Sequence, residues 1–105
     1  MFATGEVMSK KPYESLSIPP AARAGGGAEV LRAAVVGESF ALSLKRGFDD
    51  PAAWGLLFAT AARQVAHIYA AELGGDEGML LARIREAFDT DLDSAGDAGT
   101  VTATR

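Results

Sequence analysis

Residues 29–45 constrain the fold of this chain more than any other stretch. Two runs in which apolar side chains recur at every second position flank the pair Gly37-Glu38, which is typical of a β-hairpin with a two-residue loop. Glycine at the first loop position suits a type II′ turn, because that position has a positive φ. The sequence therefore predicts two antiparallel strands in which Val36 lies opposite Ser39.

This register gives the predicted hairpin one apolar face and one largely polar face. The apolar face carries Leu31, Ala33, Val35, Phe40, Leu42 and Leu44. The other face carries Val30, Arg32, Ala34, Ala41, Ser43 and Lys45. A shift of one residue would turn Phe40 and Leu42 to the polar side, so the pattern itself specifies the register.

Two amphipathic helices are predicted after the hairpin, over residues 51–73 and 76–92. Asp49 or Asp50 is placed to cap the first helix, and proline at position 51 is compatible with its first turn. Apolar residues then recur at spacings of three and four, which is the helical period. The predicted buried stripe of the first helix comprises Trp54, Leu57, Phe58, Ala61, Val65, Ile68 and Tyr69.

Gly74-Gly75-Asp76 separates the two helices. Glycine favours the left-handed conformation that ends a helix, and Asp76 is a good N-terminal cap for the next one. So short a connection predicts antiparallel neighbours. The expected fold class is α+β: an antiparallel hairpin followed by two antiparallel helices packed on one face of the ribbon.

The 105 residues predict one small ββαα domain over residues 28–92. Residues 1–27 are expected to be a flexible N-terminal segment, and residues 93–105 a disordered C-terminal tail poor in bulky side chains. A two-stranded ribbon has two open edges. Either a second copy of the chain covers them in a homodimer, or the Leu16–Ile18 segment adds a third strand.

Several short stretches together resemble a known family. They are the Ile18-Pro19-Pro20-Ala21 segment, the run from Asp50 to Gly55 (Asp-Pro-Ala-Ala-Trp-Gly), and Arg83-Ile84 with Phe88. In this order, with the hairpin between the first two, they resemble the small bacterial family catalogued as domain of unknown function 5076. The resemblance covers residues 16–92 and supports the expected fold. The family has no assigned activity, so the resemblance implies no site residues.

Composition excludes several classes of function. The net charge of −4, without a basic cluster, argues against a nucleic-acid partner. The chain has no cysteine and one histidine, so we expect no metal and no cofactor. The longest apolar run is too short to cross a bilayer, and the N-terminus lacks the pattern of a signal peptide. We therefore expect a soluble cytoplasmic protein without a membrane partner.

No set of residues has the pattern of an active site. The candidate ligand or interaction surface comprises Trp54, Phe40, Arg63 and His67. His67 is a candidate general base, but no nucleophile is predicted near it, and an exposed histidine without a catalytic role fits better. Asp49 and Asp50 provide too few oxygens for a metal site and fit a helix cap better.

Three functional hypotheses follow from the sequence. The first is a non-enzymatic protein-interaction module that associates with itself or with another protein. The second is a small-molecule binding or sensing domain with a pocket between hairpin and helices. The third, ranked well behind, is an enzyme that uses Arg46, Asp50 and His67.

Overall fold

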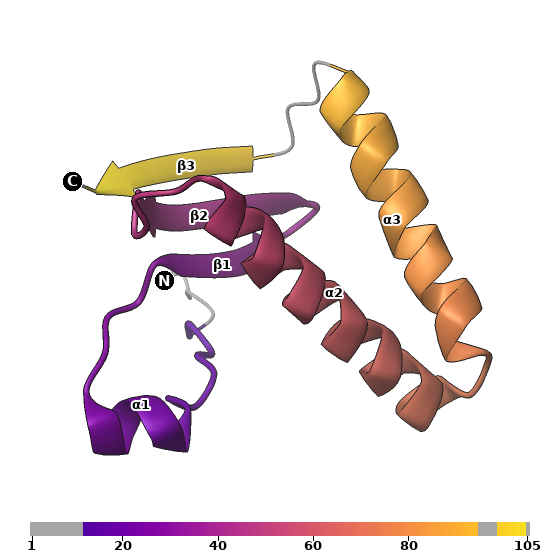
Figure 1. The fold of residues 1–105 in the computed structure, drawn as a ribbon, viewed down its shortest axis with the longest axis horizontal. Coiled ribbons are helices and arrows are strands. Elements are labelled where there is room, and N and C mark those ends of the chain that lie inside the picture. Colours follow the sequence, from indigo (N-terminus) through magenta and orange to yellow (C-terminus); the bar gives the residue numbers. More distant parts are fainter. Residues whose placement is uncertain (1–11, 95–98, 105) are drawn as a thin grey trace, which may run out of the picture.

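The chain has an α+β fold in which a helical hairpin projects from a three-stranded sheet (Figure 1). A computed structural model describes residues 12–94 and 99–104. The elements in order are α1 (Pro20–Gly25), β1 (Leu31–Val36), β2 (Ser39–Lys45), α2 (Ala52–Leu73), α3 (Glu77–Asp93) and β3 (Gly99–Thr104). The predicted hairpin and both predicted long helices are present, and the short helix α1 lies in the segment that we expected to be flexible.

The register of the hairpin is the predicted one. Val36 pairs with Ser39 across the two-residue loop, and the antiparallel ladder runs down to Leu31 opposite Leu44. Gly37 has a φ of 62°, the positive value that a glycine at this loop position supplies without strain. The two faces of the hairpin therefore carry the side chains expected from the sequence.

The C-terminal residues correct the prediction of a disordered tail over residues 93–105. Residues 99–104 form β3, which pairs parallel to β2, so the sheet is mixed and has the order β1-β2-β3. The register places Val101 beside Leu42 and extends the apolar face by one strand. The Leu16–Ile18 segment, the alternative third strand, has no regular secondary structure.

Both helix starts are capped by aspartate side chains, as the sequence predicts. An Asp50 carboxylate oxygen accepts a hydrogen bond from the Ala52 amide at 2.9 Å. An Asp76 carboxylate oxygen accepts one from the Met79 amide at 2.9 Å. Gly74 ends α2 with a φ of 81°. These contacts satisfy amide groups that have no partner within the helix.

Replacing Asp76 by alanine should remove this cap and lower the free energy of unfolding by about 1 kcal/mol. Asp76→Asn is the matched control, since asparagine keeps an acceptor oxygen at the same position and should change stability by only a few tenths of a kcal/mol. Urea denaturation followed by circular dichroism measures both. Equal losses in the two variants would show that the side-chain oxygen does not cap α3.

In the view of Figure 1 the first turns of α2 cross the ribbon, whereas the rest of α2 and α3 extend beyond it, which corrects the predicted packing of both helices on one face. Within the described residues, α2 and α3 approach each other, but no Cα atom of either helix lies within 8 Å of a strand Cα atom. Ala66 is fully buried, and Ala62 and Ala70 on the adjacent turns are half-buried. Positions four apart share one side of a helix, so α3 packs on this small-residue side of α2. The larger apolar side chains of α2 lie on a different side of the helix.

Candidate functional site

The connection from β2 to α2 is the most tightly organised local structure around the candidate residues. The Arg46 carbonyl accepts hydrogen bonds from the Phe48 amide and from the Trp54 indole N–H, both at 2.7 Å. Gly47 between them has a φ of 72°, so Arg46 to Phe48 form a γ-turn of the rare positive-φ type. The tryptophan of α2 thus holds a strained turn at the end of β2.

Two aromatic rings pack against this indole. The Phe48 and Trp54 ring centroids are 5.6 Å apart, with the rings nearly perpendicular. The Trp54 and Phe58 centroids are 5.5 Å apart, and these rings are tilted by 38°. Such pairs stabilise a cluster beyond the area that they bury. Trp54 therefore fixes the direction in which α2 leaves the sheet.

The other candidate residues lie apart from Trp54. Arg63 follows it by nine residues, which at 100° per residue places the two side chains on opposite sides of α2. The Arg63 guanidinium donates to the Thr60 hydroxyl at 3.4 Å. Phe40 lies in β2 and is 55% exposed. The predicted pocket between hairpin and helices is therefore not assembled from these residues.

His67 links the two long helices. Its Nδ1 lies 3.1 Å from an Oε1 oxygen of Glu77, at the start of α3, and both side chains are more than half exposed. Asp50 caps α2, and Arg46 lies 3.8 Å from an oxygen of Asp49. His67 is roughly 22 Å along the helix axis from the start of α2 at Ala52. Arg46, Asp50 and His67 thus have separate partners.

Replacing His67 by alanine should change the free energy of unfolding by less than about 0.5 kcal/mol, because exposed pairs contribute little. Thermal melts at neutral pH measure this, with Glu77→Gln as the control that removes the partner charge. A loss of about 2 kcal/mol in the histidine variant would show that the contact fastens the two helices together.

The strands also carry a hollow of about 200 Å³ that the sequence did not indicate. Its lining residues are Glu29, Val30, Leu31, Arg32, Ser43, Leu44, Lys45 and Thr104. The Glu29 carboxylate already holds the Arg32 guanidinium with both oxygens at 2.9 Å. These hydrogen bonds, and one that the guanidinium donates to the Tyr13 hydroxyl, raise the pKa of Arg32. None of the four predicted surface residues lines this hollow.

The part of the chain that the structure describes contains no group of three or more His, Cys, Asp or Glu side chains that could hold a metal ion. No helix in residues 12–94 is long and apolar enough to cross a membrane.

Exposed apolar side chains form the most extensive candidate surface. The first group, the α2 stripe, comprises Phe58, Val65, Ile68 and Tyr69, each between 40% and 49% exposed. These residues belong to the stripe that the sequence predicts as core. The second group, the sheet patch, comprises Val35, Phe40 and Val101, with exposures of 74%, 55% and 61%.

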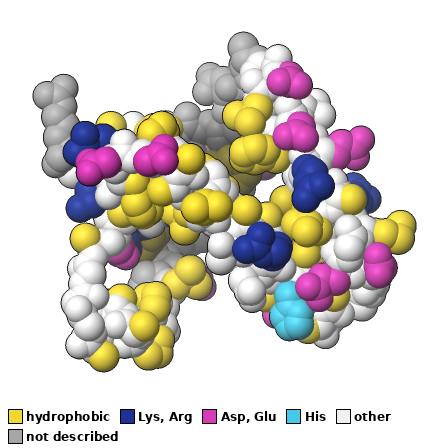
Figure 2. All heavy atoms as spheres, viewed as in Figure 1, with side chains coloured by type: hydrophobic (Ala, Val, Ile, Leu, Met, Phe, Trp, Pro, Cys, Tyr) yellow, Lys and Arg dark blue, Asp and Glu magenta, His cyan; other side chains and the backbone are white. Residues whose placement is uncertain are grey.

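The sheet patch lies on one face of the three strands. Val35 pairs with Phe40, and Val101 pairs with Leu42, two residues further along β2 on the same face. Figure 2 shows hydrophobic side chains over the sheet and along both long helices on the viewed side. The sequence identified Phe40 as a surface candidate but missed Val101, because residues 93–105 were expected to be disordered.

Comparison with known proteins gives a fold neighbour and a family. A solved structure described as a "putative pyruvate dehydrogenase" from the photosynthetic bacterium Rhodopseudomonas palustrus CGA009 is 33% identical to this chain, with a TM-score of 0.72. The alignment covers 91% of this chain and all of the other. No curated protein matches the chain. The family described as Domain of unknown function (DUF5076) matches residues 15–95, and the chain belongs to this family.

Proposed function

We propose that this protein is a non-enzymatic interaction module whose first partner is a second copy of itself. The observation that carries the proposal is the α2 stripe, four large apolar side chains at helical spacing that each remain 40–49% exposed. Contiguous apolar surface of this kind marks interaction sites in soluble proteins. Homodimer interfaces are the more apolar class, which fits such a stripe.

The size of the exposed surface supports an extensive contact. The accessible area is 8764 Å². A compact monomer of 10.9 kDa would expose roughly 5,600 Å². Residues outside the described ranges contribute to this difference as well. Even a quarter of the difference would match the area that each partner of a specific complex buries, about 800 Å². The radius of gyration, 17.2 Å, likewise exceeds the roughly 13 Å of a compact domain of this length.

An enzymatic function has less support. The Rhodopseudomonas protein is described as a "putative pyruvate dehydrogenase". In this chain the single histidine is paired with Glu77 on an exposed helix surface, far along α2 from Arg46 and Asp50. Catalysis needs such groups to converge on one reacting atom. We therefore do not extend the activity in that name to this protein.

Thermal denaturation over a hundredfold range of protein concentration tests the proposal. Folding coupled to dimerisation makes stability depend on concentration, so the midpoint of wild type should rise by several degrees across the range. Ile68→Asp places a charge in the α2 stripe and should lower the midpoint and abolish this dependence. Thr60→Asp, on the opposite side of the same helix, should behave like wild type. A wild-type midpoint independent of concentration would contradict self-association.

A further inference from the structure

We infer that the two copies pair reciprocally: the α2 stripe of each chain packs on the sheet patch of its partner. The inference rests on the proposed self-association and specifies its geometry. It differs from the alternatives in which the α2 helices pair with each other or the sheets join edge to edge. It also explains why one chain carries two separate exposed apolar surfaces, one on a helix and one on a sheet.

The distal part of the α2 stripe, Val65, Ile68 and Tyr69, does not cover the sheet of its own chain. The indole of Trp54 fastens the first turn of α2 to the end of β2 through the Arg46 carbonyl. From there α2 crosses in front of β2 and β1 in the view of Figure 1 and then continues beyond the sheet. Ile68 lies roughly 24 Å along the axis from the start of the helix at Ala52. The large apolar side chains of this distal half are therefore held beyond the sheet to which α2 is attached.

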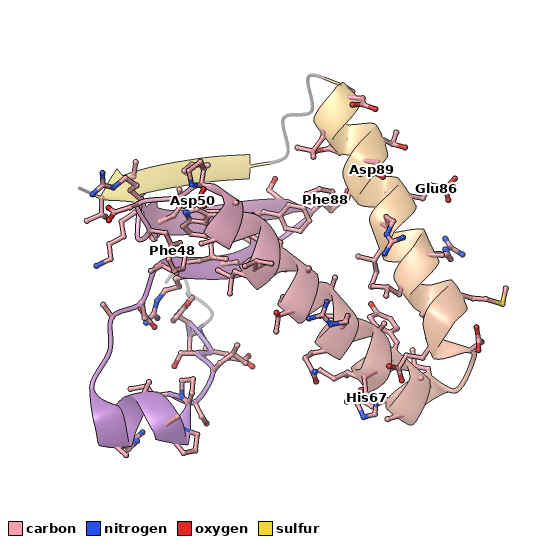
Figure 3. All side chains as sticks on the ribbon, in the orientation of Figure 1. Phe48, Asp50, His67, Glu86, Phe88 and Asp89 are labelled. Atoms are coloured by element: carbon pink, nitrogen blue, oxygen red, sulfur yellow. The ribbon has the colours of Figure 1, made fainter. Side chains whose placement is uncertain are left out.

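The sheet patch in turn lacks a second layer. A sheet with one apolar face is stable when another layer covers that face. Leu31 and Leu44, at the end of the hairpin remote from its loop, are half-buried, whereas Val35 and Phe40 beside the loop are more than half exposed. Figure 3 shows Phe88 projecting from α3 toward the side on which the sheet lies, where it extends the apolar surface. This half of the sheet needs a helical partner.

A second copy supplies the matching element. The helical hairpin has a small-residue seam on which α3 packs and a large-residue stripe that is 40–49% exposed, so it is a preformed layer with one partly open apolar side. Two helices placed side by side, 8–10 Å apart, are similar in width to three strands about 4.8 Å apart. When a two-fold axis relates the two chains, the α2 stripe of each chain meets the sheet patch of its partner. Both apolar surfaces of each chain are then buried in the dimer.

Mixing two variants tests this arrangement. Phe40→Asp damages only the sheet patch, and Ile68→Asp damages only the α2 stripe. In reciprocal pairing, a homodimer of either variant has both contacts damaged. A mixed dimer has one contact damaged twice and one contact in which both surfaces are wild type. We therefore expect each variant alone to lose the dimer at concentrations where wild type is dimeric, and an equimolar mixture to recover dimer mass.

Native mass spectrometry with one variant isotopically labelled identifies the mixed species, and circular dichroism detects regained helix if the separate variants unfold. Thr60→Asp is the control and should form dimers alone. A Phe40→Asp protein that stays dimeric while Ile68→Asp becomes monomeric would support self-association through α2 alone and overturn the reciprocal arrangement. So would the loss of both dimers without recovery on mixing. A monomeric wild type would overturn the proposed function itself.

Discussion

Replacing Trp54 by alanine is expected to lower the free energy of unfolding by about 3 kcal/mol. The change removes the rings' contacts with Phe48 and Phe58 and leaves the Arg46 carbonyl without its indole donor. Both losses fall on the turn that connects the sheet to the helices. For a domain this small, a loss of that size is a large part of the total stability. Guanidinium denaturation followed by circular dichroism measures it.

Trp54→Phe separates the two contributions. Phenylalanine keeps an aromatic ring between Phe48 and Phe58 but cannot donate to the Arg46 carbonyl, so the expected loss is about 1 kcal/mol. An alanine variant that unfolds like wild type would show that Trp54 does not fasten α2 to the sheet. The tryptophan would then be available for ligand binding, as the small-molecule hypothesis requires.

Gly47→Ala is expected to be the second most destabilising single change, with a loss of about 2 kcal/mol or more. The φ of 72° disfavours any residue with a Cβ atom, and a Cβ at this position would lie 2.8 Å from a methyl carbon of Val30. The γ-turn would have to open or the side chain of Val30 would have to move. Opening the turn would change the angle between β2 and α2.

Gly25→Ala is the matched control for this substitution. Gly25 ends α1, has no positive φ, and has open space where the Cβ would lie. Its replacement should change stability by less than about 0.5 kcal/mol. Chemical denaturation of the two alanine variants under identical conditions provides the comparison. Equal stabilities would show that position 47 does not need the left-handed backbone.

Local signals in the sequence predicted most of the individual elements. The Gly37-Glu38 loop determined the hairpin register, and the caps at Asp50 and Asp76 determined where the long helices begin. Each of these signals acts over a few residues, so the pattern alone contains the information.

The third strand depends on contacts that no local pattern specifies. Residues 100–104 alternate threonine with Val101 and Ala103, which is the period of a strand, but the side chains are small and the stretch resembles a polar tail. Pairing Phe40 with Gly99 joins positions far apart along the chain. β3 also lies beyond the residues that the family matches. A period of two over these five residues was the available signal.

The extent to which the two helices cover the ribbon was mispredicted for a related reason. The helical period of α2 identified the large side chains that need to be buried. Periodicity does not show whether the same chain or another chain buries them. The alanine residues around Ala66 form a different side of α2, and α3 packs on that side. The residues predicted as core, including Val65 and Ile68, thereby became the candidate interaction surface.

Sedimentation equilibrium of the full chain across a hundredfold concentration range tests the central claim most directly. Self-association predicts a mass of twice the 10.9 kDa chain at the upper concentrations, with dissociation only toward the dilute end. In the dimer the α2 stripe is covered, so the Ile68→Asp protein should sediment at the mass of one chain. A wild-type mass of 10.9 kDa at every concentration would contradict the account.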